Sequence, residues 1–232
     1  MNQALMARKR QHKRRKTMAK KGYTRTAGYY GRYNNPQRSL ALEKKFHDKS
    51  FFLDPSGGTT YALNAAFLDI AQGTTESTRI GRRIRIWSVH VQGRFYHPGV
   101  TTQANASNVF KLVMLLDKQC NGAAPIATDL YESDEIYSFR NLANSRRFKT
   151  LHEQVLPATA FAGSGSTFAT GDVHIPFRID KRFKSGLEVE YDSTTGAITE
   201  IKSNNLVLGF VTEDGITNTT ALCKVRVRFT DI

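Results

Sequence analysis

Alternation of apolar and polar side chains constrains the fold of this chain more than any other feature of its sequence. Within residues 82–96, apolar side chains such as Ile84, Ile86 and Val91 are interleaved with charged and polar ones, and residues 222–229 read LCKVRVRF with a period of two. Because successive side chains of a β-strand point to opposite faces, these segments predict strands with one buried and one exposed face.

Eight segments with strand character follow one another along the chain, and clusters of Gly, Asn, Thr and Ser separate them. They are residues 45–53, 82–96, 110–116, 148–156, 172–183, 187–191 together with 198–201, 206–212, and 222–229. This spacing predicts an all-β antiparallel sandwich or barrel. Eight strands with long crossovers fit a double-sheet jelly roll, so we expect a single jelly-roll domain.

One connection carries a helical pattern. Between the strand segments 110–116 and 148–156, residues 126–139 place acidic side chains on one polar side. These side chains are Asp129, Glu132, Asp134 and Glu135. The pattern predicts one short helix in a connecting loop of an otherwise all-β domain.

Charge is distributed unevenly along the 232 residues. Residues 1–38 hold 12 Lys and Arg and no Asp or Glu, whereas residues 39–232 hold 22 basic and 20 acidic side chains. A cationic block repels itself and buries little apolar area, which predicts a disordered arm over residues 1–38 and a near-neutral folded domain over residues 39–232. The apolar runs are too short for a transmembrane helix or a secretory signal, so we expect neither.

The arm is a candidate nucleic-acid-binding element, because Lys and Arg bind phosphates through counterion release without reading sequence. Its densest run, RKRQHKRRK, also has the composition of a nuclear-import signal. Four tyrosines between residues 23 and 33 either stack on single-stranded bases or anchor the arm to the domain, and both interpretations stay open. For the arm as a whole, the alternative is a solvated tail that only improves solubility. The candidate binding residues are Arg8, Lys9, Arg10, Lys13, Arg14, Arg15, Lys16, Lys20, Lys21, Arg25 and Arg32.

The folded domain has basic clusters of its own. Lys224, Arg226 and Arg228 occupy alternate positions and therefore share one face of the last strand. The candidate residues of an inner basic surface are Arg82, Arg83, Arg146, Arg147, Lys224, Arg226 and Arg228. Ordinary solvated strand faces are the alternative explanation for these clusters.

The sequence contains no constellation typical of catalysis or metal binding. Its six histidines are scattered, and no GxSxG, HExxH, GxxxxGK[ST] or GxGxxG motif is present. Cys120 and Cys223 each stand alone, which favours a reduced state. We therefore expect no enzyme activity, no cofactor and no metal site.

Five segments follow the basic arm in a characteristic order. They are EKKFHDKSFFLDPSGG, then RIGRRIRI at 79–86 behind Gln72 and Gly73, FKLVMLLDKQCNGAAP at 110–125, NSRRFKTL at 144–151, and the terminal RFTDI. This order resembles that of the jelly-roll capsid proteins of small circular single-stranded DNA (CRESS-type) viruses, and of the similar coat protein of satellite tobacco necrosis virus. The resemblance covers residues 43–232 and rests on order and spacing rather than on one diagnostic motif.

The resemblance implies two four-stranded sheets and self-assembly into a small icosahedral T=1 shell of about 60 copies. It implies that the arm points inward and packages a single-stranded genome, which makes the chain a virion component and a homo-oligomer. Some members of this group bind structural calcium between subunits, and Asp231 is the residue that could take part.

The choice between a DNA and an RNA genome rests on two indirect indications. An import signal suits a circular DNA genome that replicates in the nucleus, and the chain length is nearer that of the DNA-virus proteins, so we favour DNA over RNA. We expect a host nuclear-import receptor as a partner, the host nucleus as the place of assembly, and no membrane partner; a host attachment factor is not indicated. One alternative is a monomeric cellular β-sandwich nucleic-acid-binding module with a basic tail. The other is an enzyme of the cupin or lectin-like jelly-roll type, which the missing metal constellation disfavours.

Overall fold

The computed structural model describes residues 44–55, 61–97, 107–133, 135–159, 173–213 and 219–232. The predicted arm lies outside these residues, with all of its candidate binding residues from Arg8 to Arg32. Its predicted disorder and the domain boundary after residue 38 therefore stay predictions.

The described residues form nine strands and three short helical segments. The strands are β1 (Lys45–Leu53), β2 (Tyr61–Asn64), β3 (Arg83–His97), β4 (Ser107–Asp117), β5 (Phe148–Thr159), β6 (Val173–Tyr191), β7 (Ile201–Ser203), β8 (Asn205–Thr212) and β9 (Thr220–Asp231). The helical segments are α2 (Ala127–Leu130) and the 3-10 turns η3 (Leu142–Asn144) and η4 (Ile198–Glu200). The predicted all-β class is confirmed.

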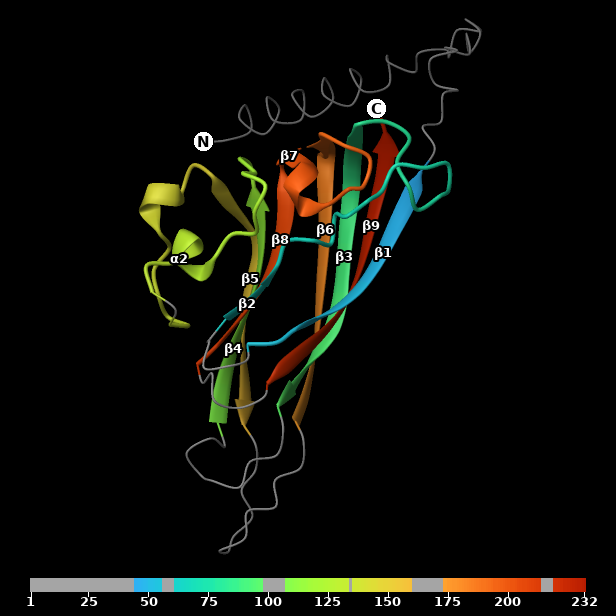
Figure 1. Cartoon of the computed structure of the whole chain (residues 1–232). Coiled ribbons are helices and arrows are strands. Elements are labelled where there is room, and N and C mark those ends of the chain that lie inside the picture. Colours follow the sequence, from blue (N-terminus) through green and yellow to red (C-terminus); the bar gives the residue numbers. More distant parts are fainter. Residues whose placement is uncertain (1–43, 56–60, 98–106, 134, 160–172, 214–218) are drawn as a thin grey trace, which may run out of the picture. The chain divides into compact units, whose positions relative to one another are not determined.

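Two antiparallel sheets face each other (Figure 1). Sheet A has the strand order β1-β9-β3-β6-β7, and sheet B has the order β2-β8-β4-β5. The chain passes between the sheets from β1 to β2, from β2 to β3 and from β3 to β4, and its last strand inserts between β1 and β3. This winding is that of a jelly roll, as predicted.

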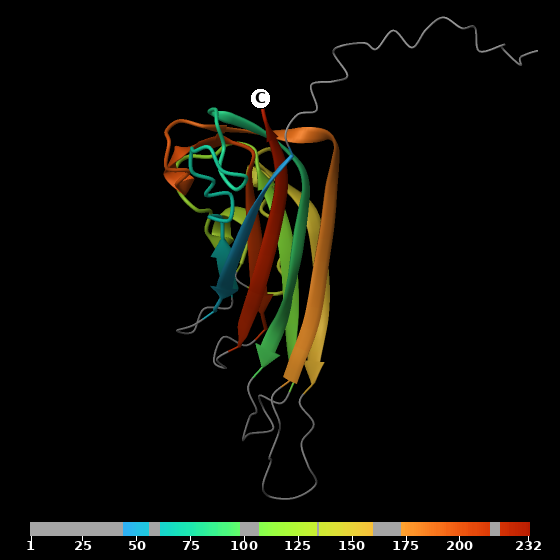
Figure 2. The ribbon, with the colours of Figure 1, turned by 90° about the vertical axis from the view of Figure 1, so that its right-hand side faces the viewer.

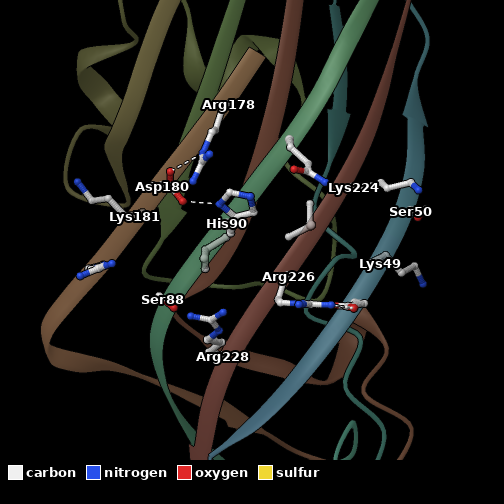
Figure 3. Close-up of a pocket in the computed structure, with 15 residues that line it drawn as sticks. Lys49, Ser50, Ser88, His90, Arg178, Asp180, Lys181, Lys224, Arg226 and Arg228 are labelled. Carbon is white, nitrogen blue, oxygen red and sulfur yellow. Dashed lines mark hydrogen bonds and ion pairs between the residues drawn. The ribbon is translucent and has the colours of Figure 1, made fainter. Parts of the chain in front are cut away.

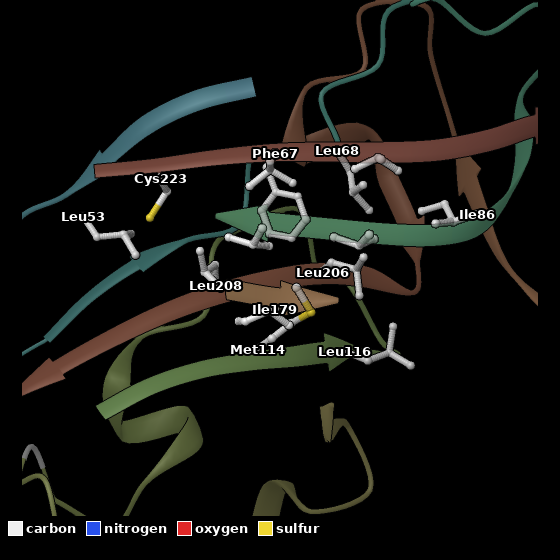
Figure 4. Packing of buried hydrophobic residues seen from close by; sticks show 14 of the residues in the cluster. Leu53, Phe67, Leu68, Ile86, Met114, Leu116, Ile179, Leu206, Leu208 and Cys223 are labelled. Atoms are coloured by element: carbon white, nitrogen blue, oxygen red, sulfur yellow. The ribbon is translucent and has the colours of Figure 1, made fainter. Parts of the chain in front are cut away.

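The space between the sheets holds the main hydrophobic core. Figure 4 shows side chains of both sheets meeting there, for example Ile86 and Ile179 of sheet A with Met114 and Leu208 of sheet B. The buried positions of β3 and β9 are the alternate apolar residues of their period-two patterns. The alternation therefore correctly marked the inner face of sheet A.

The two central strands of sheet B, β8 and β4, are buried on both faces. A second apolar cluster joins its outward side chains Val113, Leu115 and Val207 to Leu130 and Tyr131 in the connection between β4 and β5. This explains why β8, NLVLGFVT, is buried at every position and shows no alternation. Since this connection covers part of sheet B and nothing described covers the outer face of sheet A, the two sheets have different roles.

Three details of the predicted fold differ in the structure. The short strand β2 was not predicted, because its four half-buried residues show no alternation. The predicted strands 172–183 and 187–191 form one strand, β6, since the apparent turn at 184–186 is a bulge opposite Trp87 that Gly186 allows through its φ of +75°. With the three-residue β7 paired to β6, sheet A has five strands instead of four.

The predicted helix over 126–139 is limited to α2. Within it, the Asp129 carboxylate accepts a hydrogen bond from the Ile126 N–H, which closes a single turn. The chain then reverses, and Tyr131 and Arg140 form an isolated antiparallel bridge. Of the acidic residues that the pattern placed on one polar helix side, Asp129 lies in α2, whereas Glu132 and Glu135 lie on the segment that folds back.

Candidate nucleic-acid interface

The outer face of sheet A carries side chains in four rows that cross β1, β9, β3 and β6. Figure 2 shows these four strands side by side. The register defines the rows as Phe52, Leu222, Arg94 and Pro176; Ser50, Lys224, Gln92 and Arg178; Asp48, Arg226, His90 and Asp180; and Phe46, Arg228, Ser88 and Arg182. Each row contains at least one cation, so the face is basic along its length.

A hollow of about 680 Å³ lies over these strands (Figure 3). Seven Lys and Arg side chains, one His and two Asp line it. The cations come from strands that are far apart in sequence, since β1, β6 and β9 all contribute. An anionic ligand is the partner that such a lining favours.

The two carboxylates of the face are held by cations. The guanidinium of Arg226 donates to both oxygens of Asp48, with nitrogen–oxygen distances of 2.7 and 2.6 Å. Asp180 accepts hydrogen bonds from His90 and from Arg178 Nε, the latter at 2.7 Å. These hydrogen bonds hold the pKa values of Asp48 and Asp180 below the ordinary value for aspartate.

Four cations of the face make no ion pair among the described residues. Arg94, Lys224, Arg228 and Arg182 are all exposed and lie in the rows on either side of the paired central row. The ion pairs of Asp48 and Asp180 thus neutralise the central row of the face, and the rows on both sides of it keep a positive charge. Unpaired, exposed cations are available to bind phosphates.

Aromatic rings lie at both ends of the exposed side of β1. Phe52 is 69% exposed, and Phe46 is 39% exposed with the Arg226 guanidinium 5.2 Å from its ring centre. Exposed rings beside unpaired cations are the combination found where single-stranded nucleic acids stack their bases. The face therefore has the chemical groups for both phosphates and bases.

The structure brings together only part of the predicted inner surface. Lys224, Arg226 and Arg228 lie on the face. Arg82 and Arg83 lie just beyond it at the start of β3, where Arg83 is 3.6 Å from Glu190.

Arg146 and Arg147 lie elsewhere, at the connection into β5 of sheet B. Arg147 donates to both oxygens of Asp117 at 2.9 and 2.8 Å, which raises the pKa of Arg147. Its guanidinium also lies 4.6 Å from the Phe148 ring centre. Arg147 therefore holds the ends of β4 and β5 together and does not face the basic hollow.

Sequence reasoning missed the contribution of β3 to the face. His90 and Gln92 lie between the cations of β9 and β6, but this becomes evident only from the strand order β9-β3-β6. The polar side of the period-two pattern in residues 82–96 was the available signal. It indicated an exposed face without indicating its neighbours.

Among the described residues, no group of His, Cys, Asp or Glu is suited to hold a metal ion. The Asp231 carboxylate is engaged with the buried Lys45 ammonium at 3.0 Å and with the Ile80 N–H at 3.0 Å. Within a subunit, this aspartate joins the start of β1 to the end of β9. None of the described helices is long and apolar enough to cross a bilayer.

Double-sheet jelly rolls occur in viral capsid proteins, in lectins and in cupins, so the fold alone does not separate these classes. The family comparison separates them, because residues 2–232 match the geminivirus coat protein/nuclear export factor BR1 family, and the chain belongs to this family. The predicted resemblance to viral jelly-roll capsid proteins is thereby confirmed. The role of a coat protein is structural, in agreement with the expectation that the chain is not an enzyme.

Solved viral capsids are among the structures similar to this chain. The Cowpea mosaic virus top component has 11% identity, covers 78% of this chain and 85% of its own, and gives a TM-score of 0.36. The decameric BFDV capsid protein has 12% identity, covers 81% of this chain and 97% of its own, and gives a TM-score of 0.33. The 60-mer of the BFDV capsid protein has 9% identity, covers 81% of this chain and 92% of its own, and gives a TM-score of 0.32. The search of curated proteins found no match.

Proposed function

We propose that this coat protein assembles into a small icosahedral T=1 shell of about 60 copies and packages a single-stranded genome, circular DNA in preference to RNA. In this proposal the open face of sheet A and the arm of residues 1–38 both face the lumen. The observation that carries it is the outer face of sheet A, which holds a basic hollow, two exposed phenylalanines and four cations that make no ion pair within the described part of the chain. The viral family leaves no support for a cellular binding module.

The charge division of the chain supports packaging. An arm with 12 cations on a domain with 22 basic and 20 acidic residues gives subunits whose bodies repel one another little. Sixty such arms would bring about 700 positive charges into the lumen, enough for a genome of roughly a thousand nucleotides or more. Binding through phosphates requires no base readout, which suits a container for one long strand.

The choice of DNA and of the nucleus rests on the arm and on the family. The run RKRQHKRRK has the composition that an import receptor recognises, and the family description includes nuclear export factors. We infer that a host import receptor binds the arm and that assembly takes place in the host nucleus before the protein becomes part of the virion.

The test is the mass of the purified full-length protein by light scattering, with absorbance at 260 and 280 nm read on the same peak. A particle of megadalton mass with high absorbance at 260 nm is expected, and nuclease treatment of its contents then distinguishes DNA from RNA. A 26 kDa monomer that binds nucleic acid without assembling would overturn the shell and favour the export-factor branch of the family.

A further inference from the structure

The connection between β4 and β5 exposes an unusual amount of apolar surface. Four large apolar side chains within residues 126–142 are more than half exposed: Ile126 at 56%, Tyr137 at 71%, Phe139 at 81% and Leu142 at 76%. We call the described residues 126–133 and 135–142 the lobe. Large apolar side chains exposed together within one short segment favour an interaction site.

The lobe is held in shape by hydrogen bonds and by its own buried side. The Glu132 N–H donates to the Phe139 carbonyl at 3.0 Å, and the Asn141 N–H donates to the Leu130 carbonyl at 2.9 Å. On the opposite side Leu130 and Tyr131 pack on sheet B. The exposed apolar side chains are therefore displayed on a preformed surface, which loses little entropy when it binds.

The lobe is acidic in a chain that is strongly basic. Residues 126–142 contain four acidic residues and one basic residue, Arg140, whereas the whole chain has a net charge of +14. Arg140 is engaged with Glu153 of β5. Glu132 and Glu135 are exposed and make no ion pair among the described residues. Two lobes facing each other would place like charges together, which disfavours a symmetric lobe-to-lobe contact.

A second exposed apolar site has the opposite character. Ile80 and Ile232 are 56% and 45% exposed, and the Ile232 N–H donates to the Arg83 carbonyl at 3.3 Å, so the two chain segments adjoin. Arg82 beside them is exposed and makes no ion pair among the described residues. We call Ile80, Arg82, Arg83 and Ile232 the corner.

The lobe and the corner of one subunit lie apart. The lobe covers the outer side of sheet B, whereas the corner lies where β9 ends and β3 begins in sheet A (Figure 1). A subunit therefore cannot cover its own lobe with its own corner. Of the other large exposed apolar side chains, Phe46 and Phe52 belong to the candidate nucleic-acid interface, and Val155 stands alone on β5. Within the described parts of the chain, the corner is thus the remaining exposed apolar site with a charge opposite to that of the lobe.

We propose that the lobe of one subunit docks on the corner of a second copy of this chain, with Phe139 and Leu142 against Ile80 and Ile232 and with Glu135 facing Arg82. The contact joins two different surfaces, so each subunit uses both and the copies continue from one to the next until a ring closes. This inference rests on the proposed function, because it presupposes that the chain assembles.

The test compares particle masses of full-length variants by light scattering. Phe139→Ser and Glu135→Arg should each leave subunits or small oligomers, and Glu135→Arg combined with Arg82→Glu should restore the particle. Val155→Ser, which removes a similarly exposed apolar side chain outside both sites, is the matched control and should assemble normally. Circular dichroism and oligonucleotide binding of each variant should equal those of the wild type, which shows that it is folded.

The outcomes separate this inference from the proposed function. If the wild type itself stays monomeric, the proposed shell fails. If the wild type assembles and Phe139→Ser and Glu135→Arg assemble equally well, the lobe is not an interface between copies. If Glu135→Arg blocks assembly and the added Arg82→Glu does not restore it, the corner is not the surface on which the lobe docks.

Discussion

Arg79 shows how a single buried cation organises the end of the sandwich. It is fully buried, and its guanidinium donates to the carbonyls of Ile70, Gly81 and Ser193, with the Nε–oxygen distance to Ile70 at 2.9 Å. The guanidinium also lies 4.2 Å from the ring centre of Tyr191. The side chain thus reinforces the backbone hydrogen bonds that join the same segments, from the Arg79 N–H to the Ala71 carbonyl and from the Gln72 N–H to the Thr194 carbonyl.

Arg79→Met should therefore destabilise the domain strongly. A buried carbonyl left without a donor costs about 1–3 kcal/mol, and of the three hydrogen bonds only the one to Ile70 is fully buried, so a loss of about 1–3 kcal/mol in the free energy of unfolding is expected. Urea unfolding of dissociated subunits measures it. The control is the exposed neighbour Arg82→Met, which should change the unfolding free energy by less than about 0.5 kcal/mol. Equal midpoints for the two variants would show that Arg79 is not structural.

Phe52 is the residue at which stacking on the open face can be separated from phosphate binding. Phe52→Leu should weaken binding of a single-stranded oligonucleotide by about 1–3 kcal/mol, because the stacking ring is lost. The dependence of affinity on salt should stay the same, whereas Lys224→Gln should reduce the salt slope by about 0.7 through loss of one phosphate contact. Phe139→Leu, which removes an even more exposed ring on the lobe, is the control. An unchanged affinity for Phe52→Leu would mean that the face binds nucleic acid through charge alone.

At the scale of elements, β3 and β9 could be predicted from sequence because each has one buried and one exposed face, and their alternation reports it directly. The cations of β9 were found in this way. The lobe could not be predicted, since its shape depends on contacts between Tyr131 and Arg140 and with sheet B rather than on a local period. The neighbours of Lys224 on β3 and β6 required the sheet order, which no local pattern contains.

The attachment of the lobe to sheet B should depend on pH through Glu153. Burial acts to raise the pKa of Glu153, but hydrogen bonds from Lys111, at 3.0 Å, and from Arg140 outweigh it and lower the pKa below the ordinary value of 4.5. Since the pKa is lower in the folded state than in the unfolded state, the stabilisation is complete above the unfolded value and is lost as the pH falls through the folded value.

Acidification below about pH 4.5 should therefore loosen the lobe while the sandwich stays folded. Cleavage within residues 131–142 by an acid-active protease such as pepsin, followed by mass spectrometry across this pH range, measures the effect. Glu153→Gln should make the lobe susceptible at all pH values and remove the dependence. A lobe equally resistant in the wild type at every pH would show that the Glu153 contacts do not hold it.

At the scale of the whole molecule, most of the net positive charge of the sequence lies outside the described domain. The first 38 residues hold 12 of the 34 basic residues and no acidic one, while the strands of the described domain supply the buried core. The domain also keeps a basic face of its own on sheet A. Nucleic-acid binding is therefore expected from both parts, with most of the charge in the arm.

Deletion of residues 1–22 should abolish packaging and leave folding intact, because it removes nine of the arm's cations and no residue of the described core. Light scattering with absorbance at 260 and 280 nm should show particles low in nucleic acid, or free subunits, with the circular dichroism of the wild type. A variant with residues 1–22 in scrambled order is the matched control and should package normally, since phosphate binding does not depend on the order of the cations. Loss of folding in the deletion would make the arm structural, and normal packaging would assign the genome to the face of sheet A alone.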